Sequence, residues 1–306
     1  MVGVFRRSIS FPNKTPVKPS LSHHVRSISL PCRSHPLIFQ LKDQIANLHS
    51  WSLNSDSRTA AWICEGLSHL KTVHNHLDDI LNLPQTRESL RHNPHWIDKL
   101  LEHFLRFVDV YGIFQTLILS LKEEHSAAQV AMRRKDEEKI ALYVKSRKRL
   151  ARQMAKLVSS LSTVQKKTKI AEQGQAGVTA DLAAVIEEVI GVTMTVSLAL
   201  FNGISESFGT KNTWRWTRLD RVTKKVKKSA EDQEKGIQEF REIGSENLRE
   251  LKKKGKEETK IAMKKMRDLE DWISDIENGS QRVFRSLISA RVSLLNALSQ
   301  QQEHKN

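Results

Sequence analysis

The sequence predicts an all-α protein, an extended helical bundle with long coiled-coil-like helices and a disordered basic N-terminal tail. Glycine and proline are scarce between residues 37 and 300, and long stretches are rich in Ala, Leu, Glu, Lys, Arg and Gln. These residues favour helix, and no segment alternates apolar and polar residues as a strand does. The 306 residues are enough to bury a sizeable core.

The N-terminal segment differs in composition from the rest of the chain. Residues 1–35 contain four of the seven prolines, several serines and no regular apolar spacing, and the first acidic residue is Asp43. Such a segment cannot bury enough apolar surface to fold. We therefore expect a disordered basic tail over 1–35, followed by a helical domain over 36–303.

Apolar residues spaced three and four apart predict the first three helices. The first covers Leu37 to Leu48 and is broken by "NSDSR" at 54–58. The second carries its apolar stripe from Trp62 to Leu81 and stops at Pro84. The third follows "HNP" and steps from Ile97 to Tyr111, a narrow seam suited to partner helices.

The middle of the chain predicts two more helices. One is expected from about Lys122 to about Lys167, and "EQGQAG" at 172–177 indicates an internal break. Residues 189–205 are uncharged, but at 1.5 Å per residue they reach only ~26 Å, less than the ~30 Å of a bilayer core. Thr, Ser and Asn lower their hydropathy further, so we expect a buried core helix here.

The last third predicts a highly charged helix over about 213–265, interrupted by Gly236, Gly244 and Gly255. A closing helix follows, with apolar residues from Leu269 to Leu298 on most of its faces. A helix of that kind packs between others, so we expect the C-terminal part to belong to the core.

The net charge of +15 is concentrated in three segments. Lysine and arginine outnumber acidic residues over 1–42, 122–170 and 213–267, and the remainder is mildly acidic. This asymmetry suggests contact with an anionic partner, such as membrane lipid, nucleic acid or a phosphorylated protein. Solvated helix faces would produce the same charge runs.

No catalytic motif is present: the chain lacks GxGxxG, GxxxxGK[ST], HExxH, GxSxG and CxxC. His69, His74 and His76 cluster on one expected helix, but without the i, i+4 spacing and Cys or carboxylate support of a zinc site. We expect these histidines to be exposed or partly buried. The sequence therefore predicts no enzyme, no metal and no cofactor.

The sequence does not favour direct nucleic-acid recognition. "KKVKK" at 224–228 and "KKKGK" at 252–256 resemble nuclear signals or phosphate contacts. No helix-turn-helix, zinc-finger or basic-zipper pattern accompanies them, and aromatic residues are not interleaved with the charge.

A membrane-surface role is better supported. "YVKSRKRLARQMAKLV" separates an aliphatic stripe from cations at Lys145, Lys148, Arg149 and Arg152, as a helix bound to anionic lipid does. The alternative is that the aliphatic stripe faces the bundle core. We favour that alternative for the apolar face, which leaves the basic face available to anionic headgroups.

The tail contains one hexamer twice, Arg-Ser-Ile-Ser-apolar-Pro, at 7–12 and 26–31. A phosphate on Ser10 or Ser29 would add about −1.5 to −2 charge. Each serine then matches the phosphopeptide pattern Arg-Ser-x-Ser-x-Pro that 14-3-3 proteins bind through an Arg cluster. The framing residues are Arg7, Pro12, Arg26 and Pro31. One dimeric reader could bind both copies, because the linker between them spans ~25 Å on average and up to ~65 Å.

The same basic, Ser-containing leader resembles a plastid or mitochondrial transit peptide, so organelle import is a third interpretation. It lacks the apolar core of a secretory signal. Cys32 and Cys64 are too few for a disulfide framework, which fits a reduced cytoplasmic setting, with or without membrane association.

Three segments resemble the plant-specific BYPASS-like family of helical proteins, known as a domain of unknown function: "HVRSISLPCRSHP" at 24–36, "LDDILNLPQTRESL" at 77–90 and "DIENGSQRVFRSLISARVSLLNALSQ" at 275–300. The resemblance covers about 25–300 and implies a link to root and shoot development, with no catalytic residue to carry over. Residues 1–23, including the first hexamer, extend beyond that pattern, so the resemblance includes the second hexamer and not the first.

Overall fold

A computed structural model of the chain describes residues 36–54, 58–165, 178–208, 236–243 and 256–299. These residues form helices, with no strand among them, which confirms the predicted all-α bundle. The expected disordered tail over 1–35 and the expected break at 172–177 lie outside the described residues.

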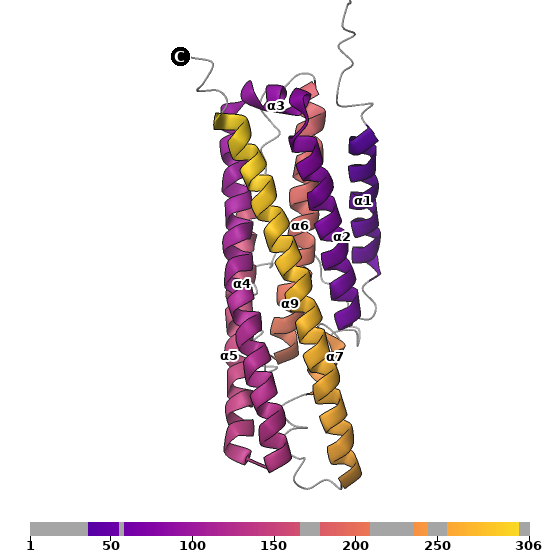
Figure 1. The fold of residues 1–306 in the computed structure, drawn as a ribbon, viewed down its shortest axis with the longest axis vertical. Coiled ribbons are helices and arrows are strands. Elements are labelled where there is room, and N and C mark those ends of the chain that lie inside the picture. The colour runs from indigo at the N-terminus through magenta and orange to yellow at the C-terminus, as the bar shows by residue number, and fades with distance from the viewer. Residues whose placement is uncertain (1–35, 55–57, 166–177, 209–235, 244–255, 300–306) are drawn as a thin grey trace, which may run out of the picture. The chain divides into compact units, whose positions relative to one another are not determined.

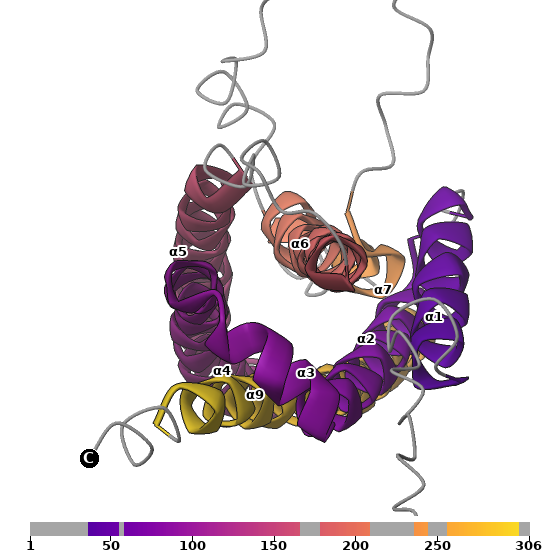
Figure 2. The ribbon, with the colours of Figure 1, turned by 90° about the horizontal axis from the view of Figure 1, so that it is seen from above.

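The described residues form eight helices: α1 (Pro36–Leu53), α2 (Ala60–Leu81), α3 (Pro84–Arg91), α4 (Pro94–Arg134), α5 (Glu137–Gln165), α6 (Val178–Phe208), α7 (Gln238–Glu242) and α9 (Lys256–Ser299). Figure 1 shows the long helices running side by side, with α3 across one end. Seen from above, α1, α2, α9, α4 and α5 form a curved layer in that order, and α6 fills its inner side (Figure 2). The last helix in the sequence therefore separates α2 from α4.

The predicted stripes of α1 and α2 face the core. Leu41, Ile45 and Leu48 are buried on α1, and the α2 positions from Ile63 to Leu77 are buried at spacings of three and four. Thr59 caps α2, because its side-chain oxygen accepts a hydrogen bond from the Trp62 N–H at 3.2 Å. Periodicity and capping therefore agree, and the first two predicted helices are confirmed.

The expected helix start near Lys122 is wrong. α4 continues through Lys122 to Arg134, because "KEEHSAAQVAMRR" contains no helix breaker. The turn comes at Lys135, whose left-handed φ of 56° ends α4 while the Asp136 N–H bonds the Ala131 carbonyl at 2.9 Å. Asp136 then accepts a hydrogen bond from the Lys139 N–H at 3.1 Å and so caps α5.

One further helix was not predicted. Residues 84–91 form α3, which begins with a proline whose fixed φ suits a first helical turn. Of the charged segment expected over about 213–265, the structure describes 236–243 and 256–265, and the five-residue α7 lies between the predicted interruptions at Gly236 and Gly244. Helix α9 begins at Lys256, directly after Gly255, and joins the end of that charged segment to the closing helix.

Helix α6 lies in the core, as predicted for 189–205. Its buried residues include Val189, Val196, Leu200 and Phe201, and it packs against α5, α2 and α1. By length and composition, Pro94–Arg134 and Leu182–Phe208 could each cross a membrane. In the bundle, 39% and 61% of their most apolar windows are buried, so the second has the burial of a core helix.

The closing helix is only partly as expected. α9 packs between α2 and α4, with Leu269, Ile273 and Leu287 buried. Its outer side, however, exposes Ile288, Val292 and Leu295 to solvent. The apolar content of this helix therefore exceeds what the described core covers.

Gly66 permits a close contact between α2 and α1. Trp51 and Trp62 stack with ring centroids 4.1 Å apart, and each indole N–H donates to the other residue's carbonyl oxygen. A Cβ on Gly66 would lie 2.3 Å from the Trp51 ring, so Gly66→Ala must displace that ring.

We expect Gly66→Ala to lower the free energy of unfolding by about 1–3 kcal/mol, measured by urea denaturation.

Gly191 provides the matched control, because nothing lies within 4 Å of the position its Cβ would take. Gly191→Ala should leave stability unchanged or raise it by up to about 1 kcal/mol, since alanine favours helix. Equal stability of the two variants would show that the tryptophan pair does not require Gly66.

Candidate functional site

The predicted basic face of α5 is exposed. Lys145, Lys148, Arg149 and Arg152 all point away from the core, and the aliphatic stripe at Leu150, Met154, Leu157 and Leu161 is buried. Arg149 also bridges to α4, with its Nη2 2.8 Å from Oε1 of Glu124. This aliphatic stripe of α5 is thus used in packing, and the basic face is exposed, together with Leu142 near the start of the helix, which is 58% exposed.

The predicted phosphoserine motifs cannot be compared with this geometry. Ser10, Ser29, Arg7, Arg26, Pro12 and Pro31 lie outside the described residues. The lysine run at 224–228 lies outside them as well, and of the run at 252–256 only Lys256, the first residue of α9, is described.

A buried arginine on α5 was missed by the sequence analysis. Arg147 is 4% exposed, and its Nη2 donates to the Phe240 carbonyl oxygen at 2.7 Å, while Nη1 donates to the Ile243 carbonyl oxygen. Its guanidinium carbon lies 4.1 Å from the centroid of the Phe208 ring, a cation–π distance. Among the described residues, no carboxylate forms an ion pair with it.

Burial lowers the pKa of Arg147 by desolvation, but an arginine side chain stays charged in proteins. The charge is therefore stabilised by backbone carbonyl dipoles and aromatic faces. The signal for this burial was present in the sequence: Arg147 stands four residues after Tyr143 and three before Leu150, in register with the buried stripe.

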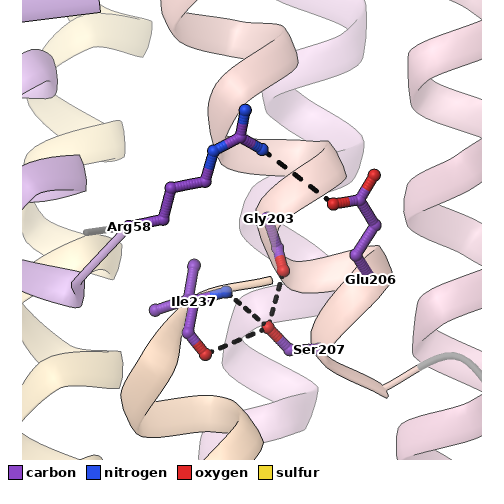
Figure 3. Close-up of polar contacts among 5 residues, drawn as sticks. All are labelled: Arg58, Gly203, Glu206, Ser207 and Ile237. Carbon is purple, nitrogen blue, oxygen red and sulfur yellow. Dashed lines mark hydrogen bonds and ion pairs between the residues drawn. The ribbon is translucent and has the colours of Figure 1, made fainter. Parts of the chain in front are cut away.

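The segment 236–243 that receives Arg147 is held to α6 by a serine. The Ser207 hydroxyl donates to the Gly203 carbonyl oxygen at 2.6 Å and accepts from the Ile237 N–H at 2.8 Å (Figure 3). Gly203 permits this approach, because a Cβ there would lie 2.9 Å from Ile237. The Ser207 hydroxyl thus joins α6 to the segment 236–243 by one donated and one accepted hydrogen bond.

The same segment also reaches α2 and α9. Glu239 Oε2 accepts a hydrogen bond from the first backbone N–H of α2, at Ala60, at 2.8 Å. Lys265 of α9 lies 2.9 Å from Glu242, and this ion pair lowers the pKa of the Glu242 carboxyl. Arg58, just before α2, lies 3.9 Å from Glu206 of α6 (Figure 3). We call 236–243 with these contacts the α7 junction.

Two histidines belong to the helix packing. His74, expected to be at least partly exposed, is fully buried against Thr193, 3.0 Å from Nε2, and its desolvation lowers its pKa to about 3. His125 lies 2.6 Å from the Tyr143 hydroxyl and 2.7 Å from the Met266 carbonyl oxygen. Burial also lowers the pKa of His125, so both imidazoles are neutral near pH 7.

Within the described ranges, no group of three or more His, Cys, Asp or Glu side chains could hold a metal ion. Cys64 is half-buried, and desolvation raises the pKa of its thiol to about 11, which disfavours the reactive thiolate. The polar groups described here therefore join helices and do not form a recognisable catalytic constellation.

These features place the chain in the class of all-α helical bundles. Within that class the chain belongs to a particular family: the profile described as Protein BPS1 matches residues 66–297, which confirms the resemblance to BYPASS-like plant proteins. Membership links the chain to plant development, without an assigned biochemical mechanism or a known enzymatic activity. Comparison with curated proteins and with solved structures gave no match.

Arg147→Met should loosen the α7 junction. Methionine fills a similar volume but leaves two buried carbonyl oxygens without donors, so we expect a loss of about 2–4 kcal/mol in the free energy of unfolding. Hydrogen exchange should rise over 237–243, measured by mass spectrometry. Lys148→Met, one residue along on the exposed face, is the control and should change neither quantity. Unaltered exchange in Arg147→Met would mean that the junction does not depend on the guanidinium.

Proposed function

We propose that this protein is a non-enzymatic regulatory scaffold in plant root and shoot development, and that it docks partners through phosphoserines in its N-terminal tail. The observation that carries the proposal is the repeated Arg-Ser-Ile-Ser-apolar-Pro hexamer at 7–12 and 26–31. Its membership of a plant developmental family without a known activity supports a regulatory role. The use of buried polar groups for helix packing supports a role without catalysis.

Each hexamer has the parts that a 14-3-3 groove requires. An Arg cluster in the groove binds the phosphate, and proline two residues after the phosphoserine turns the chain out of the groove. Ser29 is the principal candidate, because its hexamer lies in the segment 24–36 whose sequence resembles the family, outside the matched residues 66–297, and Ser10 is the second. Two phosphoserines on one tail would bind a dimeric 14-3-3 protein more tightly than either alone.

The test is recovery of 14-3-3 proteins with the full-length chain purified from plant tissue. Ser10→Ala plus Ser29→Ala should abolish recovery, because the phosphate contacts are removed. Serines of the same tail that lie outside both hexamers give a matched control: Ser20→Ala plus Ser22→Ala should retain binding and phosphorylation at Ser10 and Ser29.

Peptide mapping of the same purified protein distinguishes phosphoserine docking from organelle import. Phosphate at Ser29 on an intact N-terminus is expected. Undiminished 14-3-3 recovery in the double alanine variant would eliminate the docking proposal. A mature N-terminus after residue 35 would favour organelle import, with the tail acting as a transit peptide.

A second candidate function is binding to an anionic membrane surface through the basic face of α5. Lys145, Lys148, Arg149 and Arg152 are exposed together, and the described part of α5 contains no acidic residue after Glu138. Because the aliphatic stripe is buried in the bundle, the binding would be electrostatic and would not insert the helix. Each cation near an anionic surface contributes about 1 kcal/mol, and added salt weakens the effect.

Charge reversal tests this candidate. The wild type should co-sediment with phosphatidylserine vesicles. The triple variant with Lys145→Glu, Lys148→Glu and Arg152→Glu should not. Neither the wild type nor this variant should sediment with phosphatidylcholine vesicles. Lys260→Glu, Lys264→Glu and Arg267→Glu change the net charge equally on α9, and this control should still sediment. If both triple variants lose binding alike, net charge rather than the α5 face is responsible.

A further inference from the structure

Helices α4 and α9 expose a row of large apolar side chains. Leu105 is 38% exposed, Ile288 39%, Val292 48% and Leu295 40%. Leu101 and Val108 on α4 are half-buried beside them. Single exposed apolar residues are ordinary on a protein surface, but a contiguous set marks an interaction site. We call these six residues, Leu101, Leu105, Val108, Ile288, Val292 and Leu295, the α4–α9 stripe.

The register between the two helices places the six residues side by side. α4 and α9 run antiparallel, with Lys122 Nζ 2.7 Å from Glu277 Oε2 and Gln115 bonded to Ser280 at 2.8 Å. Closer to the N-terminus of α4 and the C-terminus of α9, the Phe284 ring lies 3.8 Å from the position that a Cβ on Gly112 would take.

Four residues beyond Gly112 and Phe284 in the same direction, Val108 lies level with Ile288. Seven residues beyond that pair, Leu101 lies level with Leu295. Spacings of three and four keep each set on one side of its helix. In Figure 2, α6 lies on the inner side of α4 and α9, and no described helix covers their outer side.

Opposite charges flank the stripe. On α4, a rotation of 100° per residue places the exposed Asp98, Glu102 and Asp109 farther from α9 than the stripe, and Glu102 is paired with Arg106 at 2.6 Å. On α9, Arg282 and Arg285 are exposed on the side away from α4, and no acidic residue of α9 occurs from 278 to 299. Asp78 of α2 also lies on that side, where it accepts hydrogen bonds from Ser289 and Ser293. Beside the stripe, the unpaired charges of the described residues are thus carboxylates on α4, at Asp98 and Asp109, and arginines on α9.

We propose that the α4–α9 stripe is the interface of a homodimer. A two-fold axis parallel to the helices lays α9 of one copy against α4 of the other, so each basic edge meets an acidic edge and the stripes pack together. Asp109 and Arg285 lie at nearly the same level, about 3 Å apart along the helix direction by the helical rise, and would pair across the interface. An anionic membrane fits this face poorly, because the acidic edge would repel it.

Sedimentation equilibrium of the full-length protein tests the proposal. The wild type should form dimers at micromolar concentration, and Val292→Glu should be monomeric, because two carboxylates would be buried in the apolar centre. Ile113→Glu is the control: Ile113 is also exposed, on α4, but lies outside the stripe, so this variant should remain dimeric. Far-UV circular dichroism confirms that each variant is folded.

A charge swap makes the test specific to the proposed geometry. Asp109→Arg and Arg285→Asp should each weaken dimerisation several-fold, and the double variant should restore it, because the pair is re-formed with reversed polarity. A wild-type monomer at all concentrations, or a dimer that survives Val292→Glu, would overturn the proposal. A monomer that sediments with phosphatidylcholine vesicles, and loses this in Val292→Glu, would assign the face to lipid and equally overturn it.

Discussion

One end of the bundle depends on the buried guanidinium of Arg147. Removing an arginine from water is costly unless its donors are satisfied, and here two backbone carbonyls and an aromatic face of other segments do so. The segment 236–243 must therefore return to α5, although it is about 90 residues away in sequence. Once there, it caps α2 through Glu239 and meets α6 at Ser207, so a single buried charge fixes the meeting point of several helices.

The other buried polar groups act in the same way along the length of the bundle. Tyr111 bonds Ser197 at 3.1 Å between α4 and α6, His74 bonds Thr193 between α2 and α6, and His125 joins α4 to α5 and α9. Apolar stripes alone permit helices to slide by a turn, whereas paired polar groups fix one register. The buried polar groups named here are thus used for packing, and the interactions proposed above all use the outer surfaces or the tail.

The spacing of apolar residues predicted the stripes of α1 and α2, length and hydropathy predicted the core position of α6, and the resemblance of three segments indicated the family. The helix start predicted near Lys122 was wrong, because residues 122–134 favour helix and α4 continues through them. The basic residues of 145–152 were expected on the surface, and the burial of Arg147 was not predicted, because an arginine is expected outside unless its partners are known. Those partners, Phe240 and Ile243, come from a segment with no periodic signal of its own.

The sequence by itself determined that this chain is helical and which residues face inward, because a helix repeats every 3.6 residues and apolar side chains avoid water. Only the tertiary structure decided that α9 lies between α2 and α4, because several helix orders would bury the same stripes. It also decided which apolar residues remain outside: Ile288, Val292 and Leu295 continue the pattern of a core helix, but no described neighbour covers them.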